Sequence, residues 1–337
     1  MPKNITECYA KLDEALTLEP QVAAKAKKLR DDIDEVLKDH GWMETSLLQG
    51  SYGRKTMYPP LKDVDLVIVL PESLSHYRSD PKGPAKVIAG FRLAIESSQK
   101  FSGVRFDLDD RPAHALQLTF PGVPFTFDLV PAFESGNPNW LYIADRDEER
   151  WDEKSDVRAL RNKVMARNVL TGGVWVRQVR QSKHALRQVP AVKALVCGLL
   201  VESLAYDAVT KAMSPQKAAE AIFAQGAKVL GRSYSGLALD DLTAKWTPEQ
   251  RAQVVAFYTD RHRLAIEALK LEADDPVAAS LTWAQVFGSA FPEVQETLAE
   301  RVARTNRLGG GTTSTGVLTT SPRVRAASPP ARPWRAT

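Results

Sequence analysis

Residues 47–70 read LLQGSYGRKTMYPPLKDVDLVIVL, and the last part of this stretch decides the fold. DVDLVIVL, residues 63–70, is a short run of apolar and β-branched side chains that Pro71 ends. Runs of this length and composition form strands that are buried in a sheet. We therefore expect a central strand here, with two aspartates, Asp63 and Asp65, at its beginning.

The residues around this strand complete a small sheet with helices beside it. Before it, residues 20–39 carry apolar side chains at three- and four-residue steps, which predicts an amphipathic helix that Gly41 ends. After it, we expect a helix over residues 85–100 and two strands, AHALQLTF (113–120) and PFTFDLVPAF (124–133), separated by the turn signal PGVP. The pattern of strand, helix, strand, strand predicts an α+β fold with a small mixed sheet.

From residue 156 onward the hydrophobic periodicity is almost wholly helical. The expected helices cover residues 157–170, 174–188, 190–210, 214–230, 248–271 and 282–303. We therefore expect a core with its N-terminal helix over residues 1–150 and a helical second lobe over residues 151–307. Residues 308–337 contain Gly, Ser, Thr, Pro and four arginines but few large apolar side chains. Such a segment cannot offset its ordering entropy, so we expect a disordered tail.

The composition argues against several classes of protein. The 337 residues contain only two cysteines, Cys8 and Cys197, so we expect neither a disulfide framework nor a cysteine zinc site. The chain begins without a signal-peptide pattern and has no apolar run long enough for a membrane, so the expected location is the cytoplasm. The net charge is +4, but without the four arginines of the tail the basic and acidic residues balance at 41 each. This balance argues modestly against binding to duplex nucleic acid.

The pair Asp63 and Asp65 has the spacing of a metal site. Side chains at positions i and i+2 of a strand point to the same face, roughly 7 Å apart. Two such carboxylates can hold Mg²⁺, with substrate phosphates completing the coordination. A third carboxylate, Asp128, lies inside the apolar segment FTFDLVPAF, where a buried charge requires a cation or hydrogen-bonding partners. Three carboxylates can hold two metal ions about 3.5–4 Å apart, an arrangement that suits in-line displacement at phosphorus.

Gly50 and Ser51 supply a tight turn with backbone N–H groups and a hydroxyl for a triphosphate. A second acidic stretch, FDLDDRP (residues 106–112), ends in Arg-Pro, which favours a turn over a metal site. Taken alone, each of these signals also fits an ordinary turn or strand end. Their order along the chain, Gly-Ser, then Asp-x-Asp, then an aspartate within a later strand, indicates a site for nucleotide transfer.

These residues resemble the signature of the polymerase-β-like nucleotidyltransferases. QGSYGRKT (49–56), followed by DVDLV (63–67), is similar to the branch that contains cyclic GMP-AMP synthase and 2′-5′ oligoadenylate synthase, whose bacterial members are called CD-NTases. FDLVP (127–131) resembles the strand that carries the third carboxylate of that family. The resemblance implies that the three aspartates are catalytic metal ligands. The implied cofactor is Mg²⁺, as two ions, for which Mn²⁺ can substitute.

The resemblance also implies a set of nucleotide-binding residues. Those in the first motif are Gln49, Gly50, Ser51 and Thr56. Further along, VWVRQVRQSKHAL (174–186) resembles the helix whose lysine reaches the phosphates, and Lys183 is the matching residue. The alternative for this residue is an ordinary surface lysine. Some members carry a serine near the phosphates where this chain has Cys197, so we leave Cys197 out of the expected site.

The function implied by the resemblance is a cyclic oligonucleotide synthase of bacterial antiphage signalling (CBASS). It would make a cyclic di- or trinucleotide second messenger from NTPs such as ATP and GTP, with release of pyrophosphate, while the helical lobe closes the nucleotide cleft. Two alternatives stay open: a linear oligonucleotide or RNA-end nucleotidyltransferase, and a catalytically silent nucleotide-binding module. We expect NTPs as substrates, no membrane, no stable duplex nucleic acid, and a regulatory or tail-modifying protein as a further partner.

Overall fold

The computed structural model describes residues 2–106, 113–155, 157–238, 240–309, 311–312 and 318–319. The chain divides into two compact units, a larger one of residues Asp13–His262 and a smaller one that combines Met1–Leu12 with Arg263–Thr337. The acidic stretch at residues 107–112 lies outside the described residues. Among the helices that the structure describes, none combines the length and the apolar character that crossing a membrane requires.

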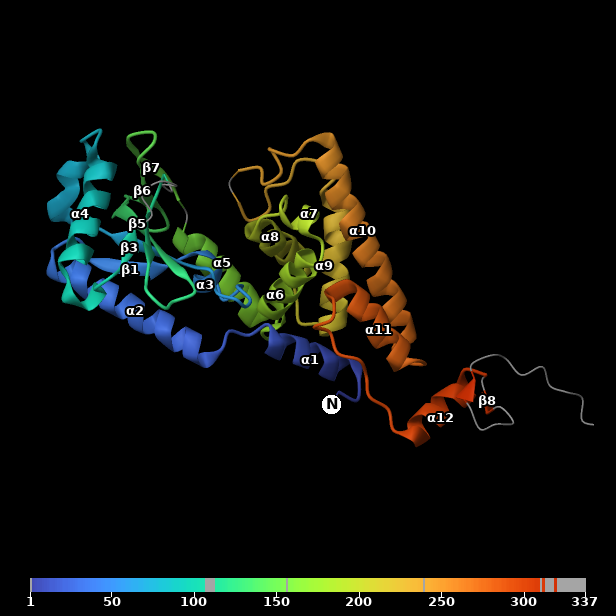
Figure 1. Ribbon diagram of the computed structural model, residues 1–337. Coiled ribbons are helices and arrows are strands. Elements are labelled where there is room, and N and C mark those ends of the chain that lie inside the picture. The colour runs from blue at the N-terminus through green and yellow to red at the C-terminus, as the bar shows by residue number, and fades with distance from the viewer. Residues whose placement is uncertain are drawn as a thin grey trace, which may run out of the picture. The chain divides into compact units, whose positions relative to one another are not determined.

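A mixed β-sheet lies in the larger unit (Figure 1). Its strands within the described residues are β1 (Thr45–Leu48), β2 (Asp63–Val69), β3 (Arg105–Phe106), β4 (Leu116–Thr119), β5 (Thr126–Glu134), β6 (Leu141–Asp145) and β7 (Arg150–Ser155). The order β1-β2-β5-β4-β3 places β2 and β5 side by side, and β6 and β7 continue the sheet from β5. β2 and β5 run parallel while the other pairs are antiparallel, which confirms the predicted small mixed sheet.

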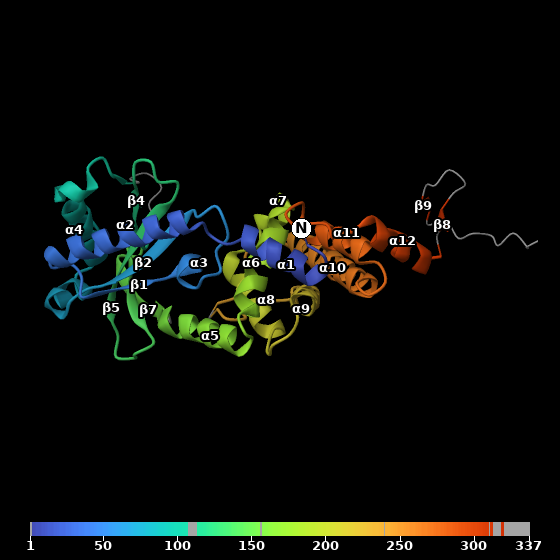
Figure 2. The same cartoon turned by 90° about the horizontal axis from the view of Figure 1, so that it is seen from below.

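Helices α2 (Pro20–Asp39) and α4 (Gly83–Ser97) lie against one face of this sheet, as Figure 1 and Figure 2 show. Alternate residues of β2 and β5 face them, so Leu66 and Leu129 share one buried core with Phe91 of α4. The helix predicted over residues 20–39 has the same bounds as α2. Two short 3-10 helices, η1 (Glu72–Arg78) and η2 (Gln99–Phe101), precede and follow α4.

The rest of the larger unit is mainly helical. It contains α5 (Val157–Leu170), α6 (Val174–Arg187), α7 (Pro190–Lys193), α8 (Gly198–Ala208), α9 (Pro215–Val229) and the first part of α10 (Pro248–Leu271). Helices α6, α8 and α9 pack against one another, and their buried side chains include Trp175, Leu204 and Phe223. The prediction of one helix over residues 190–210 is wrong, because Cys197 adopts an extended conformation immediately before α8 begins.

The smaller unit joins the two ends of the chain. Tyr9, in the first part of α1 (Ile5–Ala15), packs edge-on against the rings of Trp283, Phe287 and Phe291. The distances between ring centroids are 5.4, 5.6 and 5.2 Å, in the range that aromatic pairs favour. This cluster anchors the first residues of the chain to its C-terminal helices.

Two helices replace the one predicted over residues 282–303. α11 (Pro276–Phe287) ends at Gly288, whose φ of +79° no longer fits a right-handed helix. Pro292 then follows in an irregular segment, and α12 (Leu298–Arg307) begins only after it. The prediction is therefore wrong at this point, because a glycine and a proline interrupt an otherwise helical apolar pattern.

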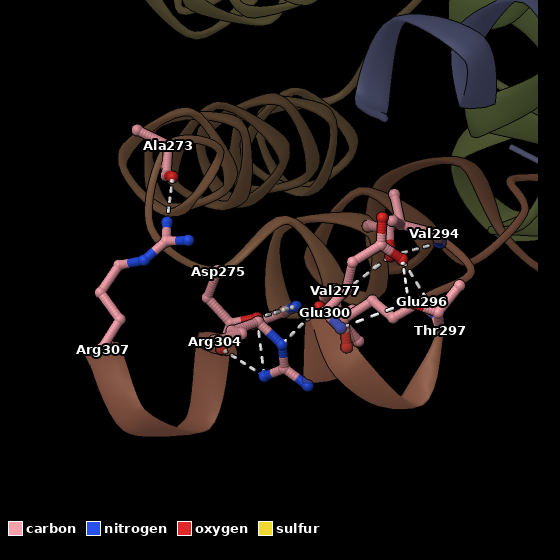
Figure 3. A network of polar contacts seen from close by, with 11 residues as sticks. Ala273, Asp275, Val277, Val294, Glu296, Thr297, Glu300, Arg304 and Arg307 are labelled. Atoms are coloured by element: carbon pink, nitrogen blue, oxygen red, sulfur yellow. Dashed lines mark hydrogen bonds and ion pairs between the residues drawn. The ribbon is translucent and has the colours of Figure 1, made fainter. Parts of the chain in front are cut away.

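Polar contacts tie α12 to its surroundings in the smaller unit (Figure 3). Arg304 donates to Asp275 at 3.1 Å and to Glu296 at 2.7 Å. Thr297 and Glu300 form a capping box, in which each side chain receives a backbone N–H of the other residue. Helix α12 is thus capped at its beginning and paired near its end.

Beyond α12 the structure describes one short ladder. Strands β8 (Gly311–Thr312) and β9 (Leu318–Thr319) pair with each other in antiparallel fashion. Most of the other residues in the expected tail lie outside the described part of the chain. The disorder expected over residues 308–337 therefore stays a prediction.

Candidate active site

The acidic side chains of the two central strands share one face of the sheet. Val64 and Leu66 of β2 are buried on the side of α2 and α4, so the alternation of the strand turns Asp63 and Asp65 to the opposite face. In β5, Asp128 is the direct partner of Asp65 across the parallel ladder. The fold therefore brings the three predicted carboxylates to one place.

The electrostatics of this face favour positive charge. Burial and then the charges of Asp63 and Asp128 raise the pKa of Asp65 from 3.8 to about 6. Burial and the charge of Asp63 also raise the pKa of Asp128, although a hydrogen bond from Gln117 lowers it. A carboxylate whose charge is penalised by burial and by like neighbours is stabilised by a cation. Positive charge beside Asp65 would therefore stabilise its ionised form.

Gln117 is a site residue that the sequence analysis missed. It lies on β4 directly opposite Asp128, and its Nε2 donates to Oδ1 of Asp128 at 2.9 Å. This contact holds one oxygen of the carboxylate and fixes the orientation of the group. The signal in the sequence was the alternation in ALQLTF, where a glutamine stands between the buried Leu116 and Leu118.

The predicted Gly-Ser turn lies directly against these carboxylates. Gln49 donates its backbone N–H to the carbonyl of Asp65 at 2.9 Å, and helix α3 (Gly50–Gly53) begins at the next residue. Gly50 has a φ of +62°, and a Cβ at this position would lie 1.7 Å from Oδ2 of Asp65. Only glycine fits here without displacing the carboxylate. The predicted phosphate-binding turn and a predicted metal ligand are therefore in contact.

Backbone hydrogen bonds close this turn into a compact unit. The N–H groups of Thr56 and Met57 both donate to the carbonyl of Ser51, at 2.9 and 3.1 Å. The side-chain oxygen of Gln49 is buried and has no hydrogen-bond partner among the described residues. A buried acceptor of this kind favours a ligand that brings a donor.

A cavity of about 360 Å³ opens beside the turn. Its walls include Ser51, Tyr58 and Asp63 from the sheet part, together with Lys183 and Cys197 from the helical part. Three further basic side chains line it: Lys62, Arg187 and Lys193. The cavity thus has a carboxylate at one side and several cations around it. This distribution of charge suits a polyphosphate that carries a metal ion.

Lys183, the predicted phosphate-binding lysine, is buried in the wall of this cavity. Only 6% of its surface is exposed, which excludes the alternative of an ordinary surface lysine. Its Nζ donates to Oε1 of Glu202 at 2.8 Å and to the carbonyl and hydroxyl oxygens of Thr56 at 3.2 Å. The three N–H bonds of the ammonium thus all have protein partners in this conformation. Thr56 is itself fully buried and belongs to the same cluster.

Glu202 is the second residue that the sequence analysis missed. Its side chain is fully buried in α8 and also accepts from Nε of Arg54 at 2.7 Å and from the hydroxyl of Thr56 at 2.6 Å. Burial alone would raise the pKa of Glu202, but Lys183 and Arg54 lower it to about 2. The signal was a single carboxylate in the apolar sequence ALVCGLLVESLAY, which needs a buried partner if the helix packs on all sides.

Residues 7–168 match the family model of the SMODS domain, described as the Second Messenger Oligonucleotide or Dinucleotide Synthetase domain. The matched residues include the Gly-Ser turn and all three aspartates. These residues carry the SMODS domain, whose description names the synthesis of oligonucleotide or dinucleotide second messengers. The resemblance stated from the motifs is confirmed over this part of the chain.

Solved CD-NTases share the fold of this chain. It is similar to the E. coli MS115-1 CdnC in its complex with HORMA-deltaN, with a TM-score of 0.67, 16% identity, and coverage of 86% of this chain and 99% of the other. The Vibrio cholerae cyclic AMP-GMP synthase DncV gives a TM-score of 0.65, 13% identity, and coverage of 86% and 98%. The Bradyrhizobium diazoefficiens CdnG bound to GTP gives 0.64, 13%, 84% and 95%. A search of curated proteins finds no match to the chain.

The donor set of this site fits a divalent cation held together with a substrate. In the part of the chain that the structure describes, no group of three or more His, Cys, Asp or Glu side chains is arranged to hold a metal ion by itself. Mg²⁺, however, usually binds through one or two carboxylates, with phosphates and water completing its coordination. Asp63 and Asp65 are two such carboxylates, and the raised pKa of Asp65 reports a deficit of positive charge beside them.

Proposed function

We propose that this protein joins NTPs into a cyclic di- or trinucleotide, with release of pyrophosphate, as a second messenger in antiphage signalling in the cytoplasm. One observation carries the proposal: three carboxylates on one face of β2 and β5 meet the Gly50–Ser51 turn at the edge of a basic cavity. A carboxylate cluster beside a phosphate-binding turn is the chemical requirement for transfer of a nucleotidyl group.

The proposed roles of the carboxylates follow from their surroundings. Asp63 and Asp65 hold the metal, and Mg²⁺ bound there supplies positive charge that stabilises the transferring phosphate. Asp128 is the proposed general base for the attacking hydroxyl. Gln117 occupies Oδ1 of Asp128, so the proton passes to Oδ2. The raised pKa of Asp128 makes this oxygen a stronger proton acceptor than an ordinary carboxylate.

The proposed reaction forms one bond and breaks one bond at phosphorus. The hydroxyl oxygen of one nucleotide bonds to the α-phosphorus of another, while the bond from that phosphorus to the bridging oxygen breaks. Pyrophosphate leaves, and the hydroxyl proton is taken up by Asp128. Repeating the step within the linear product closes the ring.

The proposed nucleotide contacts come from the turn and the cavity. Gly50 and Ser51 present backbone N–H groups and a hydroxyl to the triphosphate. Gln49 offers its unpartnered side-chain oxygen. Lys183 lies in the cavity wall and adds positive charge close to the phosphates, and the buried Thr56 accepts a hydrogen bond from it in this conformation.

We also propose that a regulatory protein acts on this enzyme. The support is a likeness of fold to a CD-NTase that was solved as a complex with HORMA-deltaN, over 86% of this chain. Purification of the tagged protein from its native cell extract would identify proteins that bind it. The activity of the pure enzyme would then be measured with and without each co-purified protein. An activity that does not change when any co-purified protein is added back would argue against it.

Incubation with Mg²⁺ and radiolabelled NTPs, followed by phosphatase, tests the proposed chemistry. A labelled product that resists phosphatase is a ring, because it has no terminal phosphate. A product that phosphatase degrades to free phosphate would instead support a linear nucleotidyltransferase. If none of the four NTPs gives a product, and each still binds, the chain is a nucleotide-binding module and the proposed function is wrong.

The cysteines offer a second test that does not depend on turnover. Cys197 is exposed and lines the cavity, whereas Cys8 is fully buried. A thiol reagent should therefore label Cys197 alone in the folded protein, and saturating NTP should slow this labelling at least tenfold. Cys197→Ser controls for labelling elsewhere. Labelling at the same rate with and without NTP would mean that the nucleotide does not occupy this cavity.

A further inference from the structure

A buried carboxylate connects helix α8 to the turn that precedes the aspartates. Glu202 is fully buried, so it cannot reach a ligand in the cavity directly. It accepts hydrogen bonds from Arg54 at 2.7 Å, Thr56 at 2.6 Å and Lys183 at 2.8 Å. Two of these donors, Arg54 and Thr56, belong to the loop that follows α3, and the third comes from α6. One side chain therefore joins three segments of the larger unit.

The residues that Glu202 contacts are the ones that close the Gly50–Ser51 turn. The backbone N–H of Arg54 donates to the carbonyl of Gly50 at 3.2 Å, and that of Thr56 donates to the carbonyl of Ser51 at 2.9 Å. Gly50 in turn lies against the carboxylate of Asp65. A continuous chain of contacts thus runs from Glu202 through the turn to the acidic face.

The charges of this cluster also act on the aspartates. It contains two cations and one anion, because Arg54 and Lys183 keep Glu202 ionised with a pKa of about 2 in spite of burial. The charge of Arg54 also lowers the pKa of Asp65, which opposes the larger effects of burial and of the neighbouring carboxylates. Because the backbone N–H of Arg54 donates to the carbonyl of Gly50, displacement of Arg54 would change the position of the turn.

We propose that Glu202 is a positioning residue for nucleotide binding, which fixes the Gly50–Ser51 turn against Asp65 and holds Lys183 in the cavity wall. This role rests on the proposed function, because the turn is the proposed site of the triphosphate. The proposed contacts between the turn and the phosphates exist both before and during the chemical step. Loss of the positioning should therefore raise KM for the NTP more than it lowers kcat.

Two variants of different severity test this role. Thr56→Val removes one hydroxyl that donates to Glu202 and keeps the shape of the side chain and both ion pairs. Glu202→Gln removes the charge that holds Arg54 and Lys183. As a matched control, Glu220→Gln removes a carboxylate on α9 that pairs with His262 at 2.8 Å, away from the turn. KM and kcat for ATP and GTP are measured for each, together with the melting temperature.

We expect KM to rise three- to tenfold in Thr56→Val and more than tenfold in Glu202→Gln, with kcat lowered less than threefold. Glu220→Gln should keep the KM of the wild type, even where its melting temperature falls. If Glu202→Gln does not fold, the KM of Thr56→Val alone tests the role of Glu202. A KM within twofold of wild type in a folded Thr56→Val protein overturns the role of Glu202. Absence of product from the wild type is a different result, which overturns the proposed function itself.

Discussion

Asp63, Asp65 and Asp128 illustrate how a local pattern of residues becomes a site. The alternation of a strand places the first two on one face, and the parallel pairing of β2 with β5 adds the third beside them. Burial and then the like charges of Asp63 and Asp128 penalise the ionised form of Asp65, which raises its pKa. Such an arrangement persists where a bound cation offsets the repulsion.

We predict that Asp63→Ala, Asp65→Ala and Asp128→Ala each lower turnover to less than a tenth of the wild-type value. A metal ligand contributes several kcal/mol to the barrier, and each ~1.4 kcal/mol is tenfold in rate. The measurement is product yield from radiolabelled NTPs in Mg²⁺. Asp31→Ala, at an exposed position paired with Lys27, is the matched control and should behave like the wild type. A variant of the three that keeps more than a tenth of the turnover would remove its aspartate from the site.

The sequence was informative about some site residues and silent about others for a physical reason. The aspartates and Gly50 stand out because a charge in an apolar strand, or a glycine before one, is unusual in its own segment. Gln117 and Glu202 act only through partners that lie far away in the sequence, such as Arg54 at a separation of 148 residues. Single-sequence patterns do not carry information about these pairings.

At the scale of an element, the turn formed by α3 depends on one glycine. We predict that Gly50→Ala lowers turnover at least tenfold, because its Cβ would occupy the place of Oδ2 of Asp65 and φ is +62°. The strain of alanine at this φ adds roughly 1–2 kcal/mol of destabilisation. Turnover and urea unfolding would be measured side by side. Gly136→Ala is the control, since nothing lies within 4 Å of a Cβ there; equal turnover in both variants would contradict the close contact.

The link between α8 and the turn should depend on pH in a defined window. The pKa of Glu202 is lowered from 4.5 to about 2 on folding, because Lys183 and Arg54 outweigh the effect of burial. Between these values the unfolded chain binds more protons than the folded one, so stability falls as pH falls from about 5 to about 2. Above pH 5 the contribution is fully present, at roughly 3 kcal/mol.

We predict that the difference in unfolding free energy between wild type and Glu202→Gln shrinks by about 2 kcal/mol between pH 5 and pH 3. Over this range the carboxylate takes up a proton in the unfolded wild type but stays ionised in the folded protein, so the stability that its charge contributes is progressively lost, and glutamine shows no such change. Urea denaturation at each pH measures the difference, and Glu220→Gln again serves for comparison. A difference that stays constant down to pH 3 would show that Glu202 is not an ionised partner of Arg54 and Lys183.

Helix boundaries were predictable where the helix and its apolar pattern end at the same residue. They were not predictable where the chain leaves the helical conformation inside an apolar stretch. The bounds predicted for residues 20–39, 157–170 and 248–271 agree with those of α2, α5 and α10. The predictions over residues 190–210 and 282–303 are wrong because apolar residues continue through both interruptions. Strands β6 and β7 were not predicted either, since each is short and the second, RWDEKS, is mostly polar.

At the scale of the whole molecule, the class of fold and the central sheet could be predicted from the sequence, but the compact units could not. The first residues of the chain pack with its C-terminal helices through Tyr9 and Trp283, which are far apart in the sequence. Contacts between residues so far apart in the sequence produce no periodic pattern in it. The functional division at residue 150, into a core and a lobe that closes the cleft, concerns the bound state and stays a prediction.

The polar contacts of α12 suggest where the chain can be shortened. Arg304 pairs with Asp275 and Glu296, Arg307 donates to the carbonyl of Ala273, and Leu308 completes the helical hydrogen bonds by donating to Arg304. A chain that ends at Leu308 keeps all these contacts. A chain that ends before Thr297 loses them together with the capping box of α12.

We predict that truncation after Leu308 leaves the melting temperature within about 2 °C of the full chain and leaves the product yield unchanged. The residues removed include three consecutive glycines and the pair Pro329-Pro330, and they lack a periodic apolar face. Ordering each residue costs roughly 1–2 kcal/mol, which such a composition does not offset. Truncation after Glu296 is the contrasting variant and should lower the melting temperature by several degrees, because Arg304 and its partners are lost. If the cut after Leu308 does the same, or abolishes most of the activity, then the last 29 residues dock on the protein and the predicted disorder is wrong.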